Sequence, residues 1–290
     1  VGAVLDAGWR RLSATGYGAR SGYLTSPVVG GSSWLAHATL LSGVWVDNQQ
    51  RYRTLVGGDR LTLNRAFRSA GWRTVAVMPG VVRDWPEGEF FGYDRVYAAA
   101  DLGYAGPRFS FAPMPDQYTL SAFQRFERAR GVGDRVPVMA EIALVSSHAP
   151  WTPIPQMLDW DEVGDGSGFV ADGPAGSPSD VWRRDPDQVR REYRDSLVYT
   201  LGTFISYVER FGDEDLVVVF VGDHQAAPLV TGEGAGADVP VTVLAGDPAL
   251  LERISGWGWD VGLRPGPDAP VWPMDTFRDR FLAAFGPGAP

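Results

Sequence analysis

The sequence predicts an α/β fold: a three-layer sandwich in which helices cover both faces of a mostly parallel central sheet. Two observations support this fold class. Apolar runs of strand length alternate along the chain with amphipathic stretches of helix length, and two of the runs end in polar, chemistry-bearing residues. Because ligands gather beyond the carboxyl ends of parallel strands, those endings predict a site at one edge of the sheet.

The individual elements follow from hydrophobic spacing and from glycine and proline breaks. Helices are expected over residues 2–15, 33–42, 61–70, 117–130 and 188–210, and short helices, turns and a last amphipathic segment over 273–285 are expected in the tail after 246. Strands are expected over residues 73–78, 137–145, 216–221 and 240–245. We expect one domain over 1–290, with its core in 1–245, an irregular insertion rich in Gly, Pro, Asp and Trp over about 149–187, and a C-terminal extension over 246–290.

Composition excludes several classes of function. The formal net charge is −9, so a nucleic-acid partner, which needs a basic surface, is not expected. The chain contains no cysteine, which excludes disulfides and thiol chemistry. No apolar run approaches the roughly 18 to 20 residues of a membrane span, so no transmembrane segment is expected in this chain.

The stretch LVVVFVGDHQ ends an apolar strand on Asp223 and His224. A carboxylate beside an imidazole suits a divalent cation, and both residues are therefore candidate metal ligands. A turn in which Asp223 caps the following segment is the structural alternative. The other two of the three histidines, His37 and His148, also lie near the ends of expected elements, where they could share one crevice with this pair.

The stretch GGSSWLAHATLLSG places Ser32 and Ser33 at the start of an apolar helix. Backbone N–H groups at a helix start favour a phosphate or an oxyanion, and the helix dipole favours the alkoxide of a serine there. His37 follows Ser33 by four residues and shares its face of the helix. A plain serine N-cap is the alternative and, for this motif alone, the preferred one.

Together these motifs resemble the alkaline phosphatase and sulfatase superfamily, most closely the extracellular domains of lipoteichoic acid synthases and phosphoethanolamine transferases. Laid on the sulfatase pattern of Cys-x-Pro-Ser-Arg followed by Leu-Leu-Thr-Gly, Ser33 takes the place of the nucleophile and His37 that of the arginine. The synthase and transferase branches use a hydroxyl nucleophile. The resemblance thus implies that Ser33 is both the nucleophile and a metal ligand, with Ser32 and His37 near the substrate.

Three further segments resemble family motifs. VSSHAPWTP is similar to Thr-Ser-His-x-Pro, which implies that His148 contacts the substrate or stabilises the leaving group. VVRDWPEGEFFGYDRVY is similar to a synthase segment that supplies Arg83 and Trp85 to the substrate phosphate, and MPDQYTL to a partner segment that supplies Asp116. The structural alternatives are a surface ion pair for Arg83, a core aromatic for Trp85 and a helix N-cap for Asp116.

One departure concerns the metal. The family's first strand normally ends in an acidic ligand ahead of the helix expected here at 2–15, so the first strand is expected to be missing. Asp6, inside that helix, is a poor substitute. We therefore expect one divalent ion (Mn, Zn, Mg or Ca), with an upstream segment or another chain supplying the missing acidic ligand.

The function implied is that of a metal-dependent phosphoryl-group transferase or phosphodiesterase working through a serine phospho-enzyme. Its expected substrate is a lipid head group or a lipid-linked or polymeric phosphodiester of the cell envelope, at the extracellular face of the membrane or outside the cell. Two alternatives stay open: a sulfatase-like ester hydrolase, and a catalytically inactive ectodomain that binds envelope glycans.

Overall fold

The described part of the chain falls into two units, and each is built around its own sheet. The computed structural model describes residues 1–109, 113–129, 136–151, 154–170 and 178–286. The middle unit consists of Phe67–Phe211 with Val1, and the terminal unit combines Gly2–Ala66 with Gly212–Pro290.

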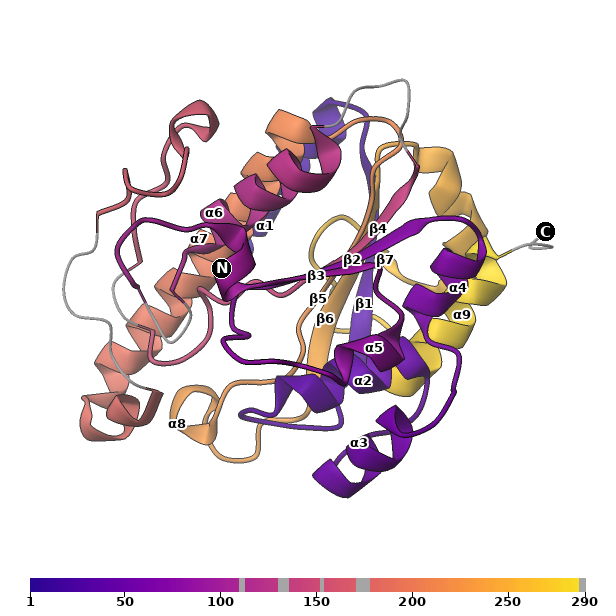
Figure 1. The fold of residues 1–290 in the computed structure, drawn as a ribbon, viewed down its shortest axis with the longest axis horizontal. Helices are drawn as coiled ribbons and strands as arrows, with labels where there is room; N and C mark the ends of the chain where they lie inside the picture. Colours follow the sequence, from indigo (N-terminus) through magenta and orange to yellow (C-terminus); the bar gives the residue numbers. More distant parts are fainter. Residues whose placement is uncertain (110–112, 130–135, 152–153, 171–177, 287–290) are drawn as a thin grey trace. The chain divides into compact units, whose positions relative to one another are not determined.

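The five-stranded sheet of the terminal unit has the order β5-β6-β1-β7, and β8 also pairs with β1. Its strands are β1 (Gly18–Thr25), β5 (Val217–Val221), β6 (Asp238–Ala245), β7 (Asp260–Val261) and β8 (Val271–Pro273). β1 and β5 both pair with β6 in the antiparallel sense, whereas β8 runs parallel to β1. β1 and β6 lie side by side in Figure 1, so β1 is an inner strand of this sheet.

The helices of the terminal unit come from both ends of the chain. They are α1 (Gly2–Ala14), α2 (Ser33–Ser42), α3 (Gln49–Val56), α4 (Leu63–Ser69, whose last residues belong to the middle unit), α8 (Pro228–Thr231) and α9 (Phe277–Phe285). α2 ends at Gly43, whose φ of 62° is left-handed and favours glycine. Arg278 of α9 donates to the carbonyl of Ser42, which places a cation at the carboxyl end of α2. The segment after residue 245 is therefore part of this unit's core.

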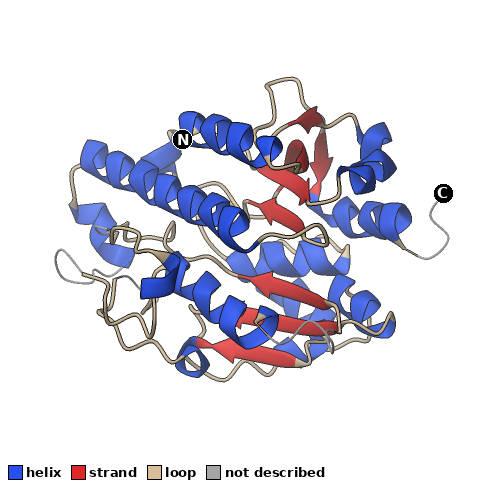
Figure 2. Cartoon of the chain, turned by 90° about the horizontal axis from the view of Figure 1, so that it is seen from above, coloured by secondary structure: helices blue, strands red, loops and turns tan. Residues whose placement is uncertain are grey.

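The three-stranded sheet of the middle unit has the order β3-β2-β4 and is parallel throughout. Its strands are β2 (Arg73–Met78), β3 (Arg95–Ala98) and β4 (Val138–Ile142), and they point the same way in Figure 2. Its helices are α5 (Gly88–Phe91), α6 (Asp116–Phe123), which continues as a π-helical turn, and α7 (Pro186–Phe211). Arg73 forms a bidentate pair with the buried carboxylate of Glu127, at the end of the sheet where β2 begins.

Most predicted elements are confirmed, with two differences. The predicted strand 73–78 and helix 33–42 match β2 and α2 residue for residue. β1 was not predicted, because glycines and polar residues interrupt its apolar pattern. The predicted mostly parallel sheet fits the three-stranded sheet but not the five-stranded one, whose pairings with β6 are antiparallel. That one domain spans 1–290 and that a first strand is missing stay predictions.

The predicted irregular insertion over about 149–187 contains only short 3-10 helices where the structure describes it. These are Trp160–Glu162 and Pro178–Arg183, and α7 then begins at Pro186. Residues 152–153 and 171–177 of the insertion lie outside the described residues.

Candidate functional site

Two segments far apart in the sequence meet at one edge of the five-stranded sheet. Because β1 and β5 are both antiparallel to β6, they run in the same direction and their carboxyl ends lie at the same edge. Directly beyond those ends, the Ser26 hydroxyl donates to the carbonyl of Asp223 (2.6 Å) and the Gly30 amide donates to the carbonyl of Gln225 (2.8 Å). These bonds hold the serine motif (Ser32 and Ser33) and the Asp-His motif (Asp223 and His224) together.

The loop that leads into α2 has an unusual backbone. Gly30 and Gly31 have φ values of 73° and 153°, and Ser32 follows with φ 67° and ψ 39°. Glycine adopts such angles freely, but a side chain in the left-handed region costs on the order of 1 kcal/mol, and such strain clusters at functional sites. The side chain of Ser32 makes no capping hydrogen bond to α2. The alternative of a plain serine cap is therefore not what this loop forms.

Ser33 is the first residue of α2, and its hydroxyl faces the Asp-His motif. Its Oγ lies 3.2 Å from Nε2 of His224, and the same nitrogen lies 3.5 Å from Oδ2 of Asp223. The other ring nitrogen of His224, Nδ1, lies 2.8 Å from the carbonyl oxygen of Gln225. Since a carbonyl only accepts, Nδ1 carries a proton, and Nε2 is the ring nitrogen that faces Ser33 and Asp223.

The carboxyl of Asp223 is held in its ionised form. Burial opposes ionisation, but the imidazoles of His224 and His37 and a hydrogen bond from Ser33 together lower the pKa of Asp223 below its ordinary value. The amide of His224 also donates to Oδ1 of Asp223. His37, on the face of α2 that Ser33 shares, therefore lies close enough to Asp223 to act on its charge.

These donor atoms fit a small divalent cation in chemistry and in spacing. Ligands about 2.0–2.1 Å from a tetrahedral metal lie roughly 3.3 Å from one another, which is close to the 3.2 and 3.5 Å separations here. A ligating histidine typically donates its other N–H to a backbone carbonyl, as His224 does to Gln225. Among the described residues, however, no three His, Cys, Asp or Glu side chains gather as a metal-binding group, so the set relies on a serine hydroxyl.

The middle unit holds the remaining predicted site residues. Arg83 and Trp85 follow the carboxyl end of β2, and His148 follows that of β4; because these strands are parallel, both loops leave the same edge of the sheet. Arg83 is exposed, whereas Trp85 is half-buried and packs against Phe91 and Tyr93. The side chain of His148 is exposed, and its Nδ1 lies 2.7 Å from the carbonyl of Ala149.

Asp116 differs from the other predicted site residues because it is completely buried. Its carboxylate accepts from the amides of Val145 and Ser146 and from the hydroxyl of Thr200. It is the first residue of α6 and not a capping residue for that helix, whose N-cap is Pro115. Burial raises the pKa of Asp116 against the effect of these hydrogen bonds. Its carboxylate is thus directed at protein groups in this structure.

The structure therefore gathers the predicted residues into two groups. The terminal unit brings together Ser32, Ser33, His37, Asp223 and His224. The middle unit carries Arg83, Trp85, Asp116 and His148, and the expectation that both groups share one crevice stays a prediction. Asp6 lies exposed in α1 and forms an ion pair with Arg264.

Sequence reasoning missed two contributors to the site and one notable neighbour of Ser33. Ser26 and the carbonyl of Gln225 hold the Asp-His motif through backbone contacts, which leave no signature in the sequence. Trp34, next to Ser33, is 48% exposed, and its indole N–H donates to the side chain of Gln49 (3.1 Å). An exposed tryptophan beside a candidate nucleophile could have been noticed from its position alone.

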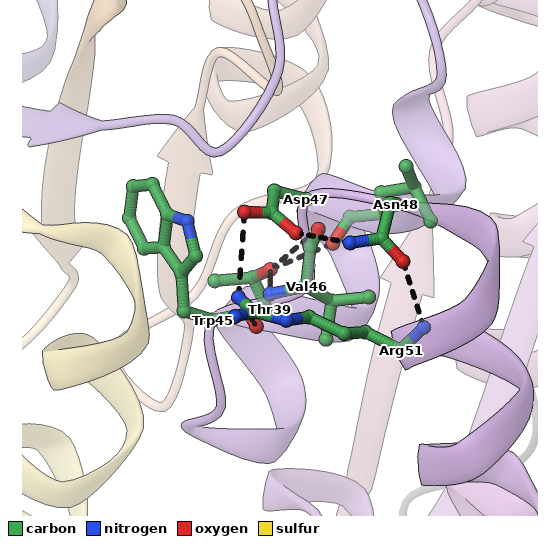
Figure 3. Close-up of polar contacts among 7 residues, drawn as sticks. Thr39, Trp45, Val46, Asp47, Asn48 and Arg51 are labelled. Carbon is green, nitrogen blue, oxygen red and sulfur yellow. Dashed lines mark hydrogen bonds and ion pairs between the residues drawn. The ribbon is translucent and has the colours of Figure 1, made fainter.

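The corner between α2 and α3 fixes the place of Gln49, the first residue of α3. Figure 3 shows the polar contacts of this corner: the Val46 amide donates to the hydroxyl of Thr39 (3.0 Å), and the side chain of Asn48 caps α3 by accepting from the amide of Arg51 (2.9 Å). Asp47 pairs with Arg51 one turn along. The corner that holds Gln49, the partner of Trp34, is thus a turn fixed by its own hydrogen bonds.

Comparison with known proteins bears on the fold. Scans against protein-family models and against curated proteins find no match. Among solved structures, the lipoteichoic acid synthase LtaP from Listeria monocytogenes is similar with a TM-score of 0.60 at 15% identity, over 98% of this chain and 65% of that one. A protein of the alkaline phosphatase superfamily from Vibrio parahaemolyticus is similar with a TM-score of 0.51 at 11% identity, over 92% of this chain and 58% of that one.

Both similarities cover nearly the whole chain but less than two thirds of the solved chains. No helix in the described ranges has the length and apolar character needed to cross a bilayer. At these identities the similarity establishes the fold and leaves the activity open. The resemblance predicted from the motifs is confirmed at that level: this chain has the fold of alkaline phosphatase superfamily proteins.

Proposed function

We propose that the chain is a metal-dependent phosphoryl-group transferase or phosphodiesterase that works through a phospho-enzyme on Ser33. The observation that carries the proposal is the convergence of the Ser33 hydroxyl, Nε2 of His224 and the Asp223 carboxylate at the start of α2. Phosphoryl transfer depends mainly on positioning and on charge stabilisation, and these groups provide both.

In this proposal Asp223, His224 and Ser33 hold one divalent ion (Mn, Zn, Mg or Ca). The bound ion would lower the pKa of the serine hydroxyl and offset negative charge on the phosphate. The described residues contain no third acidic or imidazole ligand at this point. We therefore propose that a further carboxylate, from another segment or another chain, completes the set.

The chain's own residues act in two steps. Ser33 Oγ releases its proton to solvent and forms a bond to phosphorus while the bond to the leaving alkoxide breaks, and His148 supplies the proton that the alkoxide needs. A water or an acceptor hydroxyl then gives a proton to His148 and attacks the phosphoserine; the bond from phosphorus to Oγ breaks, and Oγ takes a proton back from solvent. In the terminal unit, the first amides of α2, Ser32 and His37 orient the phosphate.

The middle unit would contribute Arg83 and Trp85 to substrate binding, the first by charge and the second by contact with the apolar part of the substrate. The proposed substrate is a phosphodiester of a lipid head group or a cell-envelope polymer, met at the extracellular face of a membrane or outside the cell. The structural neighbour from Listeria is a lipoteichoic acid synthase, which supports this substrate class.

The test is turnover of a bis-aryl phosphodiester by the wild type and by Ser33→Ala, with Ser33→Thr as the control that keeps a hydroxyl. Loss of the nucleophile should reduce the rate by a factor on the order of 10³ or more, while Ser33→Thr retains measurable turnover. Intact-mass analysis should find a covalently bound phosphate on the wild type and none on Ser33→Ala. Full turnover by Ser33→Ala would refute the assignment.

Metal content tests the site separately. Elemental analysis of the purified chain should find a stoichiometric divalent metal that Asp223→Ala loses, because few protein donors hold the ion. Unchanged metal content in that variant would exclude this site. If an upstream segment supplies the further carboxylate, a version of the chain extended by a strand that ends in Glu or Asp should bind the metal more tightly than the present chain.

A second candidate is a catalytically inactive ectodomain that binds envelope glycans. The finding that favours it is the shortage of acidic and imidazole donors among the described residues. Binding of envelope glycans by a metal-free protein without phosphodiesterase activity would support it. A sulfatase-like activity is less compatible with the sequence, which contains no cysteine to form the formylglycine of sulfatases; a screen of aryl sulfates against phosphodiesters separates the two.

A further inference from the structure

Asp116 has a buried carboxyl group for which direct contact with a substrate provides no explanation. Its side chain is 0% exposed, and its hydrogen-bond partners among the described residues are two backbone amides and one hydroxyl of the protein. Oδ1 accepts from the amides of Val145 (2.7 Å) and Ser146 (2.9 Å), and Oδ2 accepts from the hydroxyl of Thr200 in α7 (2.7 Å). The carboxylate thus joins the start of α6, the segment after β4 and the middle of α7.

The bond between Asp116 and Ser146 is reciprocal. The backbone amide of Asp116, one of the first in α6 and without an intrahelical partner, donates to the hydroxyl of Ser146 (2.9 Å). The amide of Ser146 in turn donates to the Asp116 carboxylate. Two opposed hydrogen bonds fix both the position and the rotation of Ser146 relative to α6.

The residues that Asp116 holds begin the turn that carries His148. The amide of His148 donates to the carbonyl of Val145 (3.0 Å), so Val145 to His148 form one turn. The next residues are also held, since the indole of Trp151 donates to the carbonyl of Ser147 (2.7 Å) and Arg184 donates to that of Pro150 (3.0 Å). The imidazole itself is exposed, and its Nδ1 donates to the carbonyl of Ala149.

A buried acid can serve stability alone, and the middle unit contains one for comparison. Glu127 is also buried and accepts from Arg73 and Tyr97, at the end of the sheet where β2 begins. The bonds of Asp116 lie at the opposite end, just beyond the carboxyl end of β4, and two of them are made to backbone amides of the His148 turn. A general acid or base on an exposed loop needs such support to remain in place.

We propose that Asp116 is a positioning residue for His148: its buried carboxylate holds the Val145–Ser146 end of the turn and thereby the imidazole. The proposal rests on the proposed function, in which His148 moves a proton at the leaving or incoming hydroxyl. It replaces the expectation that Asp116 binds the substrate directly. Asp116 acts through hydrogen-bond geometry and not through its charge.

The test compares Asp116→Ala with Asp116→Asn and uses Glu127→Ala as the matched control. Asparagine keeps an acceptor for the two amides, and its NH₂ group can donate to Thr200, so it should rescue most of what alanine loses. Asp116→Ala should lower kcat for a bis-aryl phosphodiester by roughly 10- to 100-fold, less than the roughly 10²- to 10⁴-fold that loss of a general acid costs, with KM little changed. Glu127→Ala should lower stability and leave kcat of the folded protein unchanged.

Two readouts do not depend on turnover. Hydrogen exchange at the amides of Val145, Ser146 and His148 should accelerate in Asp116→Ala and remain slow in Asp116→Asn and Glu127→Ala. The chain has three histidines, so its imidazole NMR spectrum is simple, and only the signal of His148 should change in Asp116→Ala. These measurements decide the positioning role even if the chain turns over no phosphodiester.

A double-mutant cycle tests whether the loss of kcat in Asp116→Ala depends on His148. If Asp116 acts through His148, Asp116→Ala should cost nothing further in kcat when His148 is already alanine. Equal losses in both backgrounds would overturn the proposal, as would an Asp116→Asn variant as slow as Asp116→Ala with the turn amides still protected. If Asp116→Ala does not fold, Ser146→Ala, which removes one of the two opposed bonds, provides the same cycle. If His148→Ala turns over at the wild-type rate, the proposed role of His148 fails, and the exchange data alone then judge the anchoring of the turn.

Discussion

The corner after α2 offers a stability test whose size follows from the structure. The hydroxyl of Thr39 donates to the carbonyl of Leu35 (2.8 Å) and accepts from the amide of Val46 (3.0 Å). Thr39 and Val46 are both 0% exposed, so water cannot replace the hydroxyl as the partner of that amide. Thr39→Val keeps the shape of the side chain and removes the acceptor.

A buried donor left without a partner costs about 1–3 kcal/mol, and we expect Thr39→Val to lower the free energy of unfolding by that amount. The control is Thr54→Val in α3, because the hydroxyl of Thr54 also donates to the carbonyl four residues before it (3.1 Å) but is exposed. That substitution should change the free energy of unfolding by no more than about 0.5 kcal/mol.

The assay is urea denaturation followed by circular dichroism, with hydrogen exchange of the Val46 amide as the local probe. The midpoint should fall for Thr39→Val at an unchanged m-value, and if the two units unfold separately, only the transition of the terminal unit should move. If Thr39→Val and Thr54→Val differ by less than about 0.5 kcal/mol, the buried hydroxyl does not support the corner, and the reasoning is refuted.

Two further predictions concern backbone strain and pH. Ser32→Gly removes the penalty of a side chain in the left-handed region, so denaturant titration should find equal stability or a gain of up to about 1 kcal/mol. A loss of stability in this variant would contradict the inferred strain. Burial opposes ionisation of Asp94, but hydrogen bonds from Thr74 and the charge of Arg68 lower the pKa of its carboxyl. Because the folded pKa lies below the unfolded value of about 3.9, this stabilisation is present above that pH and is lost as the pH falls through the folded pKa. The stability difference between the wild type and Asp94→Asn should shrink accordingly in acid, and a difference independent of pH would disprove the linkage.

Hydrophobic spacing along the sequence was enough to predict those elements whose own residues form a regular apolar pattern. The strand at 73–78 is an almost continuous apolar run, and α2 is a stretch of small and apolar residues bounded by glycines, so both could be placed from spacing alone. β1 could not, because Gly18, Ser21 and Gly22 leave no alternation to detect. Its strand conformation depends on pairing with β6 on one side and with β7 and β8 on the other, which are contacts across more than two hundred residues.

The same division holds for the candidate site. Ser33, Asp223 and His224 could be selected because a hydroxyl at a helix start and an acid-imidazole pair at a strand end have recognisable chemistry. The resemblance implied that Ser33 lies near His224, because it made both residues metal ligands, but spacing alone could not predict their 3.2 Å separation, since it depends on the unrecognised strand β1. Asp116 could be selected but not interpreted, because its burial and its bonds to the His148 turn are tertiary properties.

The position of β1 also explains why the Ser33 site is sensitive to sheet register. β6 lies between β1 and β5, with Gly18 opposite Ala245 and Thr25 opposite Asp238, so both site segments leave the sheet after strands aligned on the same neighbour. A slip of one residue in either pairing would turn every side chain of that strand to the other face and move its loop along the edge by about 3.3 Å. That displacement is as large as the separation between Ser33 and His224. The bonds from Ser26 to Asp223 and from Gly30 to Gln225 are made only in the correct register, so the contacts that build the site also select the pairing on which it depends.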